Sequence, residues 1–139
     1  MGYDLKPRNK ELEWYSMGIF SWSWMLNKGV GLVIGTGYAI KPAQYSYIAD
    51  KRGASPQSND GYYVTSKQAK IMAVVARGLV SVEKFKVQQW NEYTPEIQKQ
   101  MQDWNDKHKL YNMPVREDFI NKVENFAEWA EKSGGFWIK

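Results

Sequence analysis

Explicit start and stop signals for helices organise the C-terminal half of this chain. A Thr-Pro-Glu motif at 94–96 supplies an N-cap, a first-turn proline and an early carboxylate, so it predicts a helix over about 95–109. An Asn-Met-Pro motif at 112–114 opens a second helix, which should end at the Ser-Gly-Gly of 133–135 because glycine readily adopts the left-handed cap conformation. The Phe-Trp-Ile segment at 136–138 predicts a short strand or a docked tail.

A longer helix is expected upstream of these two. It takes Thr65 or Ser66 as its N-cap and runs to about Trp90. Gly78 in its middle costs about 1 kcal/mol relative to alanine, so we expect it to mark a kink or a close helix crossing. All three helices carry apolar residues at helical spacing. The expected stripes are Met72, Val75, Leu79, Val82 and Phe85; Ile97, Met101 and Trp104; and Val115, Phe119, Val123, Phe126 and Ala130.

The N-terminal part of the chain has weaker signals. A helix is expected over about 11–26, with apolar residues along one side at Trp14, Met17, Phe20 or Ser21, and Trp24. Residues 29–64 are rich in glycine and proline and should be irregular or β. Within them, the β-prone runs at 45–48 and 62–64 suit a paired ribbon.

A chain of 139 residues is the length of one domain, so we expect a single domain spanning 1–139. The combined pattern predicts a mostly helical α+β fold. It should have about four helices, a small irregular β ribbon within about 29–64 and a short C-terminal strand or tail.

Several chemistries are excluded by composition. The chain has no cysteine and one histidine, His108, so it lacks thiolate nucleophiles, Cys-containing zinc sites and any paired-histidine site within one subunit. The glycine-rich run at 29–37 has isoleucine where a dinucleotide fingerprint needs its third glycine, and Gly-Lys-Ser/Thr never occurs, so a Gly-bent strand or turn is expected there. Asp103 and Asp106 share a helix face and could together bind a metal ion. However, the helix also needs a polar, solvent-exposed face, which explains the two carboxylates without a metal. We therefore expect no enzyme activity, catalytic residue, metal site or cofactor.

The chain also lacks the signals of membrane targeting. Its first residues have no basic region followed by an apolar run, which is the pattern of a signal peptide. The apolar stretch at 19–34 is broken by Asn27, Lys28 and two glycines, well short of the roughly 20 residues that a spanning helix needs. We expect a cytoplasmic protein with no membrane partner.

Aromatic rings interleaved with cations are the strongest indication of function. The chain has seven Trp, nine Tyr and five Phe, and residues 28–77 carry a local charge of +5. A ligand with a flat base and phosphates needs a stacking surface and positive donors together. The candidate ligand-binding residues are Tyr38, Lys41, Tyr45, Tyr47, Lys51, Arg52, Tyr62, Tyr63, Lys67 and Lys70. The competing interpretation is that the tyrosines are ordinary strand formers and the lysines solvated edge residues.

Three motifs stand near the two ends of the chain: the opening GYDLKPRNKE at 2–11, the Phe-Ser-Trp at 20–22 and the closing FAEWAEKSGGF at 126–136. With these motifs the chain resembles a family of small uncharacterised proteins of phages and prophages. The resemblance carries no catalytic residue. It implies a small phage protein that acts by binding either a host protein or a nucleotide signal of host immunity, in the host cytoplasm.

Our leading hypothesis is a non-enzymatic binding protein that sequesters a small anionic aromatic ligand, such as a nucleotide or cyclic nucleotide immune signal, as a phage counter-defence protein. The first alternative is a protein–protein interaction module that inhibits a host protein or serves in the virion. Single-stranded nucleic-acid binding ranks third, because the net charge is only +4. We also expect a homo-oligomer, at least a dimer, with the region of Gly78 or the segment at 136–138 in the interface.

Overall fold

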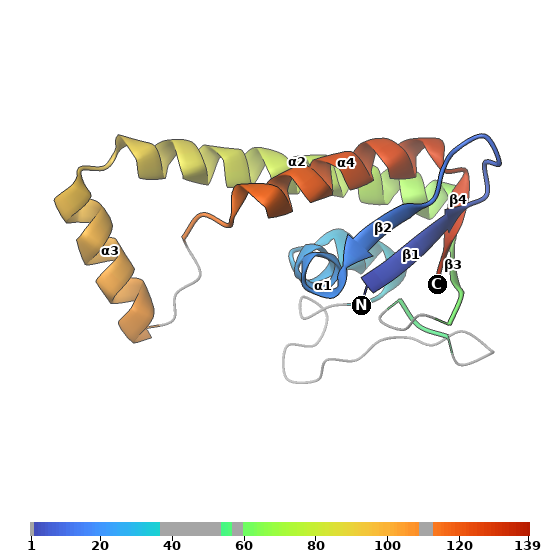
Figure 1. The fold of residues 1–139 in the computed structure, drawn as a ribbon, viewed down its shortest axis with the longest axis horizontal. Coiled ribbons are helices and arrows are strands. Elements are labelled where there is room, and N and C mark those ends of the chain that lie inside the picture. The colour runs from blue at the N-terminus through green and yellow to red at the C-terminus, as the bar shows by residue number, and fades with distance from the viewer. Residues whose placement is uncertain (1, 37–53, 57–59, 109–112) are drawn as a thin grey trace.

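The computed structural model describes residues 2–36, 54–56, 60–108 and 113–139, and shows a mostly helical α+β fold (Figure 1). Within these ranges, four α-helices and one 3-10 helix accompany a four-stranded sheet. In chain order the elements are β1 (Gly2–Pro7), β2 (Tyr15–Gly18), α1 (Ile19–Asn27), η1 (Val30–Ile34), β3 (Tyr62–Thr65), α2 (Ser66–Glu92), α3 (Pro95–His108), α4 (Glu117–Lys132) and β4 (Gly135–Ile138).

The sheet joins the two ends of the described chain. Its strand order is β2-β1-β4-β3 and every neighbouring pair is antiparallel. The C-terminal strand β4 lies between β1 and β3, with Ile138 opposite Leu5 on one side and Tyr62 on the other. Side chains alternate between the two faces, so Leu5 and Val64 are buried while Lys6 and Thr65 are exposed. The expected C-terminal strand is therefore confirmed.

The expected helix over 11–26 is wrong in its first half. Residues 15–18 form strand β2, which pairs with β1 in the register Tyr3 opposite Met17, and the helix begins only at Ile19. Trp14 and Phe20, expected on the inner side of that helix, are exposed. Backbone pairing with β1 and burial of Met17 override the helical spacing of the large apolar residues. The run at 62–64 is a strand but pairs with β4, while its expected partner at 45–48 lies outside the described residues.

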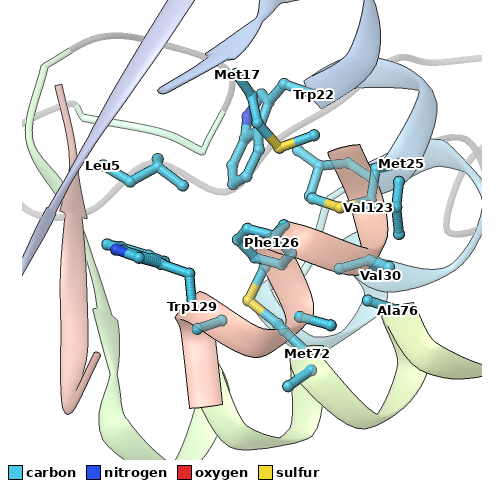
Figure 2. Packing of buried hydrophobic residues seen from close by; sticks show 14 of the residues in the cluster. Leu5, Met17, Trp22, Met25, Val30, Met72, Ala76, Val123, Phe126 and Trp129 are labelled. Atoms are coloured by element: carbon cyan, nitrogen blue, oxygen red, sulfur yellow. The ribbon is translucent and has the colours of Figure 1, made fainter. Parts of the chain in front are cut away.

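The core lies between the sheet and helices α1, α2 and α4. Figure 2 shows Phe126 among Trp22, Met72 and Trp129, which come from three different helices. The rings of Trp22 and Phe126 meet edge to face with centroids 5.8 Å apart, a favourable arrangement of two aromatic quadrupoles. The buried Trp22 Nε1 donates to the carbonyl of Pro56 at 2.9 Å, so the indole is satisfied as well as packed.

Helix ends follow the sequence signals closely. Thr65 caps α2 with a full capping box, in which its hydroxyl accepts from the Gln68 amide and the Gln68 side chain accepts from the Thr65 amide. Thr94 Oγ1 accepts from the amide of Ile97 at the start of α3. Gly134 has a φ of +70°, the left-handed conformation expected after α4. These caps explain why the bounds of α2, α3 and α4 agree with expectation to within a few residues.

The expected inner face of α2 is only partly right. Its buried residues are Ala69, Met72, Ala73, Ala76, Val80 and Glu83, whereas Val82 and Phe85 are exposed. Small alanines on the inner face let α4 and η1 approach closely, and this packing sets the rotation of the helix. Helix α2 also runs unbroken past Gly78, which is exposed, and a Cβ added there would meet nothing within 4 Å, so the described residues show neither a kink nor a close crossing at this position. For the glycine-rich run we expected a bent strand or a turn, and its described part forms the 3-10 helix η1, a series of tight turns and not a strand.

Helix α3 stands apart from this core. It begins after a turn at Tyr93 and Thr94, and it extends from the far end of α2, away from the sheet (Figure 1). None of its residues is buried in the described structure, and Ile97 and Trp104 of its expected apolar stripe are exposed. No helix of the described chain is long and apolar enough to cross a membrane.

Candidate ligand pocket

Most residues of the expected ligand site fall outside the part of the chain that the structure describes. Tyr38, Lys41, Tyr45, Tyr47, Lys51 and Arg52 all lie there. The remaining four occupy one corner of the fold, with Tyr62 and Tyr63 in β3 and Lys67 and Lys70 in the first turns of α2. Both lysines are exposed and both tyrosines half-buried. Among the described residues, only this part of the predicted patch can be placed.

Tyr63 belongs to a row of rings and cations on the outer face of the sheet. Its ring lies 4.9 Å from that of Trp137, and its hydroxyl accepts from Arg8. Lys6 Nζ lies over both Trp137, at 5.7 Å, and Trp14, at 5.9 Å. We call these five residues the sheet-face row. The row combines stacking surfaces and positive charge, although four of its members were not predicted.

A second candidate site lies beside the C-terminal end of α1 and the middle of α2. A cavity of about 420 Å³ is bordered there by the C-terminal end of α1, the middle of α2, one residue of α3 and the segment before α4. We call it the Glu83 pocket. Its described lining residues are Trp24, Asn27, Lys28, Glu83, Lys86, Asn105, Met113 and Val115.

Glu83 gives this pocket its chemical character. Its side chain is only 3% exposed, which is rare for a carboxylate. Oε1 accepts from Lys86 Nζ at 3.1 Å, but Oε2 is buried and finds no partner within the described residues. Asn105, another lining residue, likewise has a buried Oδ1 without a partner among the described residues. A buried acceptor without a donor costs roughly 1–3 kcal/mol, so a donor from water or from a bound molecule would stabilise both oxygens.

The rest of the lining supplies an aromatic wall and positive charge. Trp24 packs against Phe119 of α4 with ring centroids 5.8 Å apart, and Arg116 covers Phe119 at 4.8 Å. This stack fixes the indole at the edge of the pocket. Lys28 directly follows α1 and is exposed, while Lys86 is part-buried beside Glu83. The pocket therefore combines two acceptor oxygens, one indole and two ammonium groups.

Sequence reasoning missed this site, although a signal for it exists. Glu83 lies on the same helical face as Ala69, Met72, Ala76 and Val80, which are the inner residues of α2. A carboxylate that continues an apolar stripe points to a buried, functional or paired acid. The expected stripe shares Met72 with this inner face but continues through Val75, Leu79 and Val82, about one residue away around the helix, so Glu83 falls on its flank.

Comparison of the chain with protein-family models, with curated proteins and with solved structures gave no match. Among the described residues, no group of three or more His, Asp or Glu side chains is placed to hold a metal ion. The pocket's own geometry therefore carries the functional argument.

Proposed function

We propose that the protein is a non-enzymatic binding protein that captures a small anionic aromatic ligand of the nucleotide class in the Glu83 pocket. The observation that carries this proposal is the buried Glu83 carboxylate in the pocket wall, one oxygen of which has no hydrogen-bond partner among the described residues. A volume of about 420 Å³ lies within the range of roughly 300–1,000 Å³ that is common for small-molecule sites.

The pocket matches the three parts of a nucleotide. Glu83 Oε2 and Asn105 Oδ1 are both acceptors, and a small movement of either side chain would expose its oxygen to an exocyclic amino group of a base. The flat ring can pack on the Trp24 indole, and the phosphate can approach the ammonium group of Lys28 at the rim. Because Lys86 already neutralises one Glu83 oxygen, the carboxylate does not repel an anionic ligand as strongly as a free acid would.

The physiological setting follows from the resemblance to small phage proteins. A binding protein without catalytic groups lowers the free concentration of its ligand in proportion to its own abundance. We propose that this chain sequesters a nucleotide signal of host defence in the host cytoplasm.

Calorimetric titration with mono-, di- and cyclic nucleotides tests the proposal. Amino-bearing adenine nucleotides should bind at least about tenfold more tightly than inosine nucleotides, which lack the exocyclic amino group, because the loss leaves buried acceptors unpaired. Glu83→Gln should weaken binding by a similar factor, since the amide places a donor near the ligand amino group. Glu124→Gln, an exposed acid paired with Lys84, is the matched control and should bind as the parent does.

Two results would contradict the proposal. One is the absence of binding heat with every nucleotide in the panel. The other is release of a chemically altered ligand after denaturation of the complex, because a sequestering protein returns its ligand intact.

The sheet-face row favours a second candidate function, single-stranded nucleic-acid binding. The sheet-face row places three rings and two cations side by side on the outer face of the sheet, as in stacking platforms for bases. Fluorescence anisotropy with a labelled oligonucleotide tests it. Affinity should fall steeply with salt, and Trp14→Ala should weaken binding by about 1–3 kcal/mol. A Trp14→Ala protein that binds as the parent does would remove the row from consideration.

A further inference from the structure

Helix α2 has a second apolar face, opposite the face that enters the core. Four large apolar side chains on it are exposed, from 44% for Ile71 to 67% for Val74. The others are Val82 and Phe85. At 100° per residue these positions cluster about 180° from the buried residues Ala69, Ala76 and Val80. A helix that is apolar on two opposite sides needs a second partner to cover the outer one.

The spacing of this outer stripe is symmetric. Ile71 and Val74 precede Gly78 by seven and four residues, and Val82 and Phe85 follow it by four and seven. Gly78 is exposed, and a Cβ added to it would meet nothing within 4 Å. The chain's own packing therefore gives no reason for a glycine that costs about 1 kcal/mol in a helix interior. A partner helix crossing closely at Gly78 would supply that reason.

We propose that this face pairs with the same face of a second copy of the chain, in an antiparallel arrangement about a two-fold axis at Gly78. Reversing the helix about Gly78 brings Ile71 to the level of the partner's Phe85 and Val74 to the level of the partner's Val82. The same apolar pattern thus meets itself at every level, which is the requirement of an isologous two-fold interface. A parallel pairing would place Phe85 against Phe85 at one end of the contact and Ile71 against Ile71 at the other. The two ends of the helix pair would then differ in side-chain volume.

Charges at the ends of the stripe support the antiparallel direction. Lys67 and Glu92 are both exposed, and neither forms an ion pair with another described residue. In the antiparallel arrangement, Lys67 lies on the same side of the helix pair as the partner's Glu92, about 4.5 Å away along the axis. The two-fold axis makes this opposite-charge contact twice. In a parallel arrangement, Lys67 would face Lys67.

The size of the stripe sets the strength of the contact. It spans 14 residue steps, or about 21 Å, and presents one helix face from each copy. A stable dimer generally buries about 1,200–2,000 Å² in total, so a contact of this size belongs at the weak end of that range. We therefore expect a reversible monomer–dimer equilibrium that depends on concentration. The stripe and Glu83 lie on opposite faces of α2, so pairing and ligand binding are independent claims.

Sedimentation velocity from about 1 µM to about 1 mM protein tests the pairing. The parent should shift from the 16.2 kDa monomer to a dimer as concentration rises. Val74→Glu places two charges in the interface and should raise the dissociation constant at least about tenfold. Ile97→Glu, on the exposed side of α3, is the matched control and should change it less than about twofold. A monomer at all concentrations, or disruption by Ile97→Glu alone, overturns the proposal.

The absence of cysteine makes the direction of pairing directly testable. Gly78→Cys should form a disulfide with itself across the two-fold axis under mild oxidation. Ile71→Cys alone should not, whereas an equal mixture of Ile71→Cys and Phe85→Cys proteins should give the mixed disulfide. Efficient self-linking of Ile71→Cys would mean a parallel pair and would overturn the antiparallel arrangement. The mixed disulfide remains a readout if the added side chain at Gly78 weakens the crossing.

Discussion

Helices α3 and α4 follow one another in the chain and carry similar sequence signals, yet the structure treats them oppositely. Each begins with an acidic first turn and has apolar residues at helical spacing. Helix α4 buries six residues, including Phe126, Val123 and Trp129, while the described structure buries none of α3. The comparison teaches that an apolar stripe predicts a helix but leaves open what covers it.

The difference comes from what surrounds each helix. Helix α4 packs along α2 (Figure 1). Its Phe126 meets Phe136 of β4 edge to face. Helix α3 touches the body through fewer groups. Gln98 donates to the carbonyl of Trp90, and Asn105 reaches the Glu83 pocket. In our account α4 provides stability, and α3 forms one wall of a ligand site.

The largest expected effect is on the free energy of unfolding, which should depend on the core helix α4 and not on α3. Phe126→Ala removes a fully buried ring from the middle of the core and should lower the free energy of unfolding by about 3–5 kcal/mol. Trp104→Ala removes an exposed ring from α3 and should change it by less than about 0.5 kcal/mol. Urea unfolding followed by circular dichroism measures both. Equal losses for the two variants would mean that α3 shares the core.

The N-cap threonines of α2 and α3 allow a second comparison between a helix in the core and a helix outside it. Thr65→Ala removes the capping box of α2 and should cost roughly 0.5–2 kcal/mol of global stability, because α2 unfolds with the core. Thr94→Ala removes the corresponding hydroxyl from α3 and should reduce helix content without moving the global unfolding midpoint. Far-ultraviolet circular dichroism reports helix content, and the urea midpoint reports the core. A lowered midpoint in Thr94→Ala would argue against the separation.

A smaller effect concerns the outer face of α2. Gly78→Ala should stabilise the monomer by about 0.5–1 kcal/mol, because the added methyl group meets no other atom and the helix gains propensity. Thermal unfolding at low micromolar concentration, with Ser81→Ala as a control on the same face, measures this gain. The same substitution should weaken self-association. Destabilisation at low concentration would show that Gly78 is needed within the monomer.

The smallest effect appears only in alkaline solution. Burial raises the pKa of Tyr15 to about 12, and its hydroxyl donates to the carbonyl of Lys122 in α4. Because the folded pKa lies above the unfolded value of 10.0, this contribution is complete below pH 10 and is lost as the pH rises toward 12. The free energy of unfolding should fall across that window in the parent and fall less in Tyr15→Phe. Burial also raises the pKa of Tyr3, so part of the slope should remain.

Local signals predicted the helices well and the sheet poorly. The caps at Thr65, Thr94 and Gly134 are short-range features, so the sequence alone located α2, α3 and α4. The pairing of β1 with β2 and β4 depends on contacts between distant residues, and a single sequence does not reveal them. The prediction over 11–26 failed for this reason. Trp14, Met17 and Trp24 have the spacing of a helical stripe, but residues 15–18 form a strand.

The candidate binding sites also depend on contacts between residues that are distant in the sequence. Tyr63 was predicted from the local mixture of rings and cations, but its neighbours Trp137 and Lys6 come from strands at the two ends of the chain. The Glu83 pocket gathers residues from α1, α2 and α3, so only the tertiary fold brings Trp24 and Asn105 together. The one local hint was an acid on the inner face of a helix.

Hydrogen–deuterium exchange with and without a saturating nucleotide tests the central claim most directly. If the ligand lies in the Glu83 pocket, it bridges α3 to α1 and α2 through Asn105, so amides over 98–105 should exchange more slowly when it is bound. Amides over 126–130 of α4, already in the core, should not change. A measured binding heat with unchanged exchange over 98–105 would place the ligand elsewhere and contradict the account.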